Sequence, residues 1–267
     1  MKLVLVSAAS LVVTACGGHR GWFALPDARS RDAAPERTAV ALEERGSCPG
    51  LSGSGPVVVL VHGIGGETQN VRDVRAVLER LEPAALLSFH WSAVEETRAL
   101  VTRFAGGLSH LARCAGDSRP IVVLAHSAGG VLSAMAVSEL TTAEAAHDIV
   151  LVTVASPLGG AGFASWRLNL LPAKPFVLTL GGRFEGYPAP APGVRVVHVR
   201  THPASDAAMR QIRSGHFPDD PRAVVPGSRE HALPVHVDHD DALLWAARAL
   251  AETPAVFGLE DARRLSD

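Results

Sequence analysis

The sequence repeats one pattern: a short apolar run, largely of β-branched residues, then a turn of small residues, then apolar residues at helical spacing. The clearest runs cover residues 57–61 and 121–125. A short, continuous apolar run is typical of a strand that is buried on both faces. Such strands alternate with helices in folds whose parallel sheet carries helices on both sides. The pattern therefore predicts an α/β fold with a mostly parallel central sheet flanked by helices on both faces.

The expected elements follow in order along the chain. Strands are expected at 57–61, 85–91, 121–125, 149–155 and 194–200, and helices at 71–81, 93–111, 131–140 and 240–251. Residues 158–193 interrupt this alternation with several Gly and Pro residues. Long segments of this kind inside a domain are commonly functional, so we expect an insertion or lid there.

The first residues have the pattern of an export signal. Lys2 precedes a short apolar run that ends in Val13-Thr14-Ala15-Cys16. The run is shorter than the about 20 residues that cross a membrane, and its order of charge, apolar core and small residues is typical of a secretory signal peptide. Its last four residues resemble a bacterial lipobox, in which the Cys becomes the first residue and carries lipid, although that pattern prefers Leu where Val13 stands.

The chain is accordingly divided into a signal peptide at 1–15, a tether at 16–55 and a main domain at 56–267. The lipobox resemblance implies a bacterial cell-envelope protein held at a membrane by lipid on Cys16, and Gly17 after it implies the outer membrane or periplasm; ordinary secretion is the alternative. An oxidising compartment permits a disulfide between Cys48 and Cys114, which the sequence leaves open. The net charge of −2 lacks the basic excess of nucleic-acid binders, so we expect no such partner.

The strongest chemical signal lies between an expected strand and an expected helix, at Ala125-His126-Ser127-Ala128-Gly129-Gly130. A nucleophile on a sharp strand-to-helix turn needs small residues two positions away on either side, and Ala125 and Gly129 occupy these positions. The turn places the Ser127 hydroxyl at a helix N-terminus, where free N–H groups favour negative charge. The motif therefore predicts Ser127 as a catalytic nucleophile.

A glycine-rich stretch follows the first expected strand, at His62-Gly63-Ile64-Gly65-Gly66. An acyl-transfer intermediate needs two backbone donors directed at its oxyanion. The N–H groups of Ile64 and Ala128 are the expected donors, and the glycines allow the loop to approach the site. A phosphate-binding loop is disfavoured because no Gly-Lys-Ser/Thr follows.

These motifs together resemble the α/β-hydrolase superfamily, and small bacterial lipases and esterases in particular. Ala155-Ser156-Pro157-Leu158-Gly159-Gly160, after the next strand, adds to the resemblance, which covers about residues 56–251. The resemblance implies an α/β-hydrolase fold for the main domain. It also implies a catalytic acid and then a histidine that follow the nucleophile in chain order.

Asp206, in the loop after the strand at 194–200, is the expected acid, with Asp219 and Asp220 as competitors. His239, just before the last helix, is the expected base that takes the Ser127 proton. Its competitors are His216, His231 and His236. A metal site built from His236, Asp238, His239 and Asp240 is a weaker interpretation, because side chains of adjacent residues diverge.

The resemblance implies hydrolysis of a small-molecule or lipid ester through an acyl-enzyme, with no cofactor and no metal. Two alternatives stay open. One is acyl transfer, or amide or thioester hydrolysis, by the same residues. The other is a surface lipoprotein that keeps the fold only for binding, since fold is no proof of catalysis.

Overall fold

The computed structural model describes residues 21–24, 48–64, 71–116, 119–158, 189–201, 225–234 and 237–259. Seven strands are found in this part of the chain. They are β1 (Gly21–Ala24), β2 (Val57–Val61), β3 (Ala85–His90), β4 (Ile121–His126), β5 (Ile149–Val154), β6 (Val194–Arg200) and β7 (Arg229–Ala232). The five expected strands are confirmed to within one residue, whereas β1 and β7 carry no long apolar run and were not expected.

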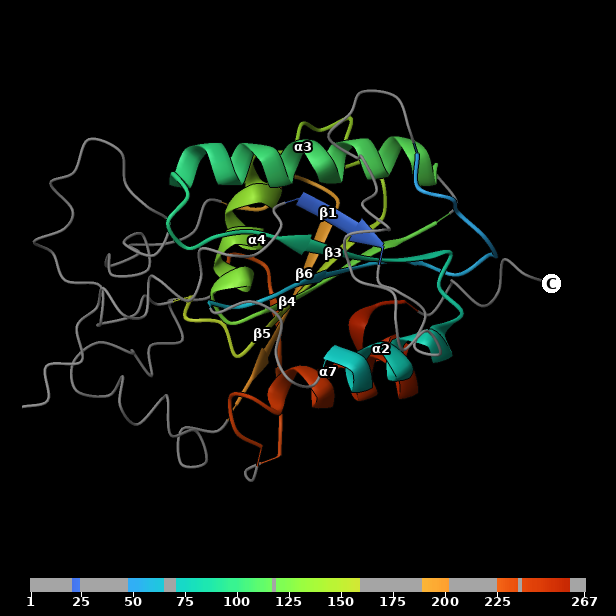
Figure 1. The fold of residues 1–267 in the computed structure, drawn as a ribbon, viewed down its shortest axis with the longest axis vertical. Helices are drawn as coiled ribbons and strands as arrows, with labels where there is room; N and C mark the ends of the chain where they lie inside the picture. Colours follow the sequence, from blue (N-terminus) through green and yellow to red (C-terminus); the bar gives the residue numbers. More distant parts are fainter. Residues whose placement is uncertain are drawn as a thin grey trace, which may run out of the picture.

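One sheet contains all seven strands, in the order β1-β3-β2-β4-β5-β6-β7. Only β1 is antiparallel to its neighbour; the other six strands run parallel. The parallel strands therefore end together, at what we call the carboxyl end of the sheet, and begin together at its amino end. The expected mostly parallel α/β sheet is confirmed (Figure 1).

The described helices cover both faces of the sheet. They are α2 (Val71–Leu78), the 3-10 turn η2 (Glu79–Leu81), α3 (Thr97–Ala115), α4 (Ala128–Ser138), α7 (Ala242–Glu252) and the 3-10 turn η5 (Pro254–Phe257). α3 and α4 lie on one face, and α2 and α7 on the other (Figure 1). None of these described helices has the length and apolar character that crossing a membrane requires.

Two hydrophobic cores explain why β2 is apolar throughout. Val59 belongs to the core under α3 and α4, and Val58 belongs to the core under α2 and α7. Because successive side chains of a strand point to opposite faces, a strand between two layers of helices has no position left for a polar residue.

Three helices begin at residues other than those expected, and one of them, α7, starts at Ala242 rather than 240. α3 starts at Thr97 rather than 93 because the Glu96 carboxylate accepts hydrogen bonds from the N–H groups of Arg98 (2.9 Å) and Ala99 (2.7 Å). These bonds cap the helix and hold the pKa of Glu96 below its usual value. α4 starts at Ala128 rather than 131, directly after Ser127.

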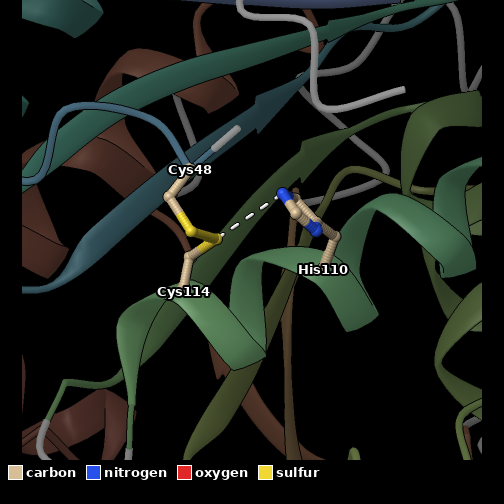
Figure 2. A group of neighbouring side chains, drawn as sticks. All are labelled: Cys48, His110 and Cys114. Carbon is tan, nitrogen blue, oxygen red and sulfur yellow. Dashed lines mark hydrogen bonds between the residues drawn. A yellow bond between two sulfur atoms is a disulfide. The ribbon is translucent and has the colours of Figure 1, made fainter. Parts of the chain in front are cut away.

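A disulfide joins Cys48 to Cys114, with 66 residues of sequence separation. It connects the chain before β2 to the C-terminal end of α3, at the amino end of the sheet (Figure 2). His110 Nε2 lies 3.5 Å from Cys114 Sγ. Of the residues predicted to be a tether, 21–24 thus pair with β3 and Cys48 is bonded to α3. The predicted signal peptide, Cys16 and most of the insertion at 158–193 lie outside the described residues.

Candidate active site

Ser127 occupies the turn between β4 and α4, at the carboxyl end of the sheet. Its backbone has φ 53° and ψ −126°, a conformation that non-glycine residues adopt only under constraint. Its N–H donates a hydrogen bond to the carbonyl of Val154 (2.8 Å), at the end of the neighbouring strand β5. Ser127 is half-buried, so the strained turn presents a serine at the surface of the sheet's carboxyl end.

The glycines after Ser127 allow α4 to pack closely on the strand ends. A Cβ on Gly129 would lie 2.3 Å from the carbonyl oxygen of His62, and a Cβ on Gly130 would lie 1.9 Å from Oγ of Ser156. Real Cβ atoms do not approach other atoms so closely. The motif's small residues are therefore required by the contact of α4 with two other segments.

The loop after β2 lies directly against Ser127. A Cβ on Gly63 would lie 2.9 Å from Cβ of Ser127 and 3.5 Å from its Oγ. Ile64 follows Gly63, and Ala128 begins α4. The two residues expected to stabilise the oxyanion, Ile64 and Ala128, thus directly follow the two residues that are in contact, Gly63 and Ser127. Gly65 and Gly66 lie outside the described residues.

His62 and Trp91 hold this loop in place. The backbone N–H of Trp91 donates to His62 Nε2 (3.2 Å), its Nε1–H donates to the His62 carbonyl (3.1 Å), and the two rings stack at 5.3 Å between centroids. Because Nε2 accepts, the imidazole proton sits on Nδ1, which donates to the Gly63 carbonyl (2.7 Å). In a trans peptide the carbonyl and the N–H that follows it point in opposite directions. Because the Gly63 carbonyl faces the His62 ring, the Ile64 N–H points away from that ring.

Sequence reasoning missed this role of Trp91. The available signal was its position: it is the residue directly after β3, and so it lies at the carboxyl end of the sheet beside β2. A tryptophan there is 6% exposed and offers both a ring and two N–H donors.

His239 is held beside the residue that precedes Ser127. His126 Nε2 donates to the backbone carbonyl of His239 (2.9 Å), and the two rings lie 4.7 Å apart. Asp238 fixes the same turn, since its carboxylate accepts from the N–H groups of Asp240 (3.1 Å) and Asp241 (3.0 Å). The structure therefore brings the turn that carries His239 to the strand-to-helix turn at Ser127, and assigns Asp238 a role within the His239 turn.

Of the other candidate bases and acids, only His231 lies within the described residues. His231, on β7, has its ring 6.0 Å from Phe257, which belongs to the core under α7. His216 and His236 lie outside the described residues, as do the expected acid Asp206 and its competitors Asp219 and Asp220.

A second buried histidine lies near the carboxyl end of β6. His198 is 8% exposed, and its Nδ1 lies 2.8 Å from Oγ1 of Thr153 on β5. Burial, reinforced by the positive charge of Arg200 and opposed by Glu230, lowers the pKa of His198 to about 4. His198 is therefore neutral at physiological pH and serves as a hydrogen-bonding residue within the sheet.

Comparison with known proteins supports the fold. The structure resembles the crystal structure of the Bacillus licheniformis lipase BlEst2 in its mature form, with a TM-score of 0.56 at 14% identity over 90% of this chain and 100% of that one. The propeptide form of the same lipase gives a TM-score of 0.55 at 14% identity, over 90% of this chain and 54% of that one. No protein-family model and no curated protein matches the sequence. At this identity the likeness shows a shared α/β-hydrolase fold.

Proposed function

We propose that this protein is a serine hydrolase of carboxylic esters. The observation that carries the proposal is the backbone of Ser127, which has φ 53° between a parallel strand and a helix, with Gly63 packed against its side chain. Strained turns of this kind are concentrated at functional sites. The shared fold with a solved lipase supports the same chemistry.

In the proposed reaction, Ser127 Oγ attacks the ester carbonyl carbon while His239 accepts its proton. The N–H groups of Ile64 and Ala128 stabilise the oxyanion. His239 then protonates the departing alcohol, which leaves an acyl-enzyme, and water hydrolyses that intermediate with His239 again accepting the proton. Asp206 accepts a hydrogen bond from the imidazole and stabilises its charged form.

We also propose that the protein acts in the cell envelope, anchored by lipid on Cys16. The sequence motif at 13–16 motivates this proposal. The Cys48–Cys114 disulfide supports the compartment, because such bonds persist in oxidising compartments outside the cytosol. Metabolic labelling with a palmitate analogue is expected to mark the natural chain and not Cys16→Ser.

The test of the reaction compares two serines of the same segment. Ser127→Ala is expected to lower kcat for p-nitrophenyl acetate by about 10⁴-fold or more, because residues of a catalytic unit fail together. It is also expected to abolish covalent labelling by a fluorophosphonate. Ser138→Ala, in the last turn of α4, is the control and is expected to retain both the turnover of p-nitrophenyl acetate and the fluorophosphonate labelling. Unchanged turnover in purified, folded Ser127→Ala would contradict the proposal.

A further inference from the structure

Three side chains of the kinds that bind metal ions meet at the amino end of the sheet, opposite the end that carries Ser127. They are Cys48, before β2, and His110 and Cys114, both on α3 (Figure 2). Their possible ligand atoms, two sulfurs and one ring nitrogen, lie within 4.8 Å of one another. Within the described part of the chain, no other group of three His, Cys, Asp or Glu side chains converges in this way.

We propose that Cys48, His110 and Cys114 bind one Zn²⁺ ion when the Cys48–Cys114 disulfide is reduced, with water as the fourth ligand. The ion then connects the chain before β2 to α3 in place of the disulfide. This inference does not rest on the proposed hydrolase activity, because the site lies at the other end of the sheet and takes no part in that reaction.

α3 supplies two of the ligands from one side of the helix. His110 and Cys114 are four residues apart, and side chains at this spacing lie one above the other on a helix. His110 Nε2 lies 3.5 Å from Cys114 Sγ. A tetrahedral Zn²⁺ ion, with a Zn–S distance of about 2.3 Å and a Zn–N distance of about 2.0 Å, holds its sulfur and nitrogen ligands about 3.5 Å apart. The helix therefore sets the spacing that the ion requires.

Cys48 supplies the third ligand and the freedom to adjust. Two thiolates on one tetrahedral Zn²⁺ ion lie about 3.8 Å apart, so the two sulfurs must separate when the metal replaces the disulfide. Cys48 is exposed and belongs to neither a helix nor a strand, so rotation of its side chain can provide this movement. Its exposure also lets water reach the fourth position on the ion.

The chemistry of the ligands selects the metal. Thiolate sulfur and imidazole nitrogen suit Zn²⁺, whereas Mg²⁺ and Ca²⁺ take oxygen ligands. Two Cys and one His, with a fourth position left for water, form an established set of zinc ligands. Zn²⁺ with two thiolates and a neutral imidazole has no net charge, so the site needs no further charged residue.

The arginines at this end of the sheet have other partners. Arg113 Nη1 donates to Ser109 Oγ (2.6 Å) and lies 3.9 Å from the Glu144 carboxylate. Arg119 donates to the Gly53 carbonyl (3.1 Å). Both guanidinium groups are therefore directed at oxygen atoms outside the three ligands.

Reduction and metal binding are two separate steps. A dithiol reductant becomes a disulfide, and the two electrons and two protons that it loses convert Cys48 and Cys114 to thiols. Zn²⁺ then displaces one proton from each thiol, which leaves two thiolate ligands. In the disulfide form His110 Nε2–H is the donor, because a disulfide sulfur carries no hydrogen. On the ion, the neutral ring binds through Nε2 and carries its proton on Nδ1.

The test uses the full chain with Cys16→Ser, in which Cys48 and Cys114 are the only cysteines. The chain is reduced with a phosphine and titrated with Zn²⁺, and in parallel with Co²⁺, whose visible spectrum reports tetrahedral thiolate ligation. We expect the reduced chain to bind one ion. The oxidised chain is expected to bind at least about 100-fold more weakly, because binding requires deprotonated thiols that the disulfide does not offer.

His110→Ala in the same background tests the nitrogen ligand, and His231→Ala, on the edge strand β7, is its control. We expect His110→Ala to weaken Zn²⁺ binding by the reduced chain at least about tenfold, since even the loss of a group that only supports a ligand has such an effect. His231→Ala is expected to leave the affinity unchanged.

Urea unfolding distinguishes a site in the folded protein from thiols of an unfolded chain. An ion that binds the folded state stabilises it, so Zn²⁺ is expected to raise the urea midpoint of the reduced chain, and to raise that of reduced His110→Ala less. The proposal is overturned if the reduced chain does not bind one ion, or if the oxidised chain binds it equally well. It is also overturned if His110→Ala keeps the affinity, or if Zn²⁺ lowers the midpoint or leaves it in place.

Discussion

Ser127 and Ala155 both have a positive φ, which is rare for residues other than glycine, and each directly follows a parallel strand. Their φ values are 53° and 46°. A non-glycine residue in such a region costs about 1–3 kcal/mol. Both N–H groups continue the sheet's hydrogen bonding, from Ser127 to Val154 (2.8 Å) and from Ala155 to Val199 (2.9 Å). The strain at single residues is therefore maintained by bonds to the neighbouring strand.

The glycine that follows the strand-to-helix turn at Ser127 gives the first residue-scale prediction. Gly129→Ala would place Cβ 2.3 Å from the His62 carbonyl and 2.8 Å from that of Val61. Because both neighbours are backbone atoms, neither can rotate away, and we expect the free energy of unfolding to fall by about 3 kcal/mol. Gly106→Ala, at an exposed position of α3 with open space around it, is expected to raise the free energy of unfolding by up to about 1 kcal/mol. Urea unfolding measures both, and equal stabilities would contradict the packing at that turn.

His62 gives the second prediction at this scale, since it acts through the loop rather than on the substrate. His62→Ala removes the bonds to Trp91 and to the Gly63 carbonyl. We expect kcat for a soluble ester to fall on the order of 10²-fold, because a misplacement of about 1 Å has this effect, with little change in KM. His62→Asn is expected to recover part of the loss, since its amide donates to Gly63 in place of Nδ1. An unchanged kcat in His62→Ala, or no recovery with Asn, would assign His62 a purely structural role.

At the scale of elements, the disulfide joins the chain before the sheet to the end of α3. β2, α2, β3 and α3 all lie within the loop that it closes. The loop on which Gly63 approaches Ser127 belongs to this part of the chain. The bond therefore constrains the unfolded chain around one wall of the candidate site.

Removal of the disulfide is expected to lower stability substantially. For a 66-residue separation, the loop-closure relation gives about 4 kcal/mol. The variant is the double substitution Cys48→Ser with Cys114→Ser, and the measurement is the urea midpoint. The natural chain in reductant is the matched control and is expected to show the same loss. A midpoint that neither treatment moves would contradict the bond.

At the scale of the whole molecule, stability depends on pH through His198. Its pKa is about 4 in the folded protein, against an ordinary value of 6.5. Below pH 6.5 the unfolded chain binds a proton that the folded protein does not, so protonation favours the unfolded chain. The free energy of unfolding therefore falls as the pH drops from 6.5 towards 4. We expect a loss of up to about 3 kcal/mol over this range.

Urea unfolding at pH 7 and pH 4.5 measures this change. His198→Gln, which does not titrate, is the control, and the difference between the two pH values is expected to shrink in it. If both chains lose the same stability on acidification, His198 is not the source.

The strands and the strand-to-helix turn at Ser127 were predictable because their causes are local. β2, β4 and β5 are continuous apolar runs, and a strand between two layers of helices has to be so. β1 and β7 were not predictable, because both are four-residue strands at the two edges of the sheet whose stability comes from their partners. The start of α3 was placed four residues too early, since hydrophobic spacing does not show which acidic side chain caps the helix.

The sequence by itself determined the fold class and the strand-to-helix turn at Ser127, since each depends on residue types at short spacing. Tertiary structure alone decided that Trp91 braces His62, that His126 holds the carbonyl of His239 and that Cys48 reaches Cys114. These pairs are 29, 113 and 66 residues apart. No local pattern encodes such contacts, because they form only when parallel strands end side by side and when a helix returns the chain to the sheet's other end.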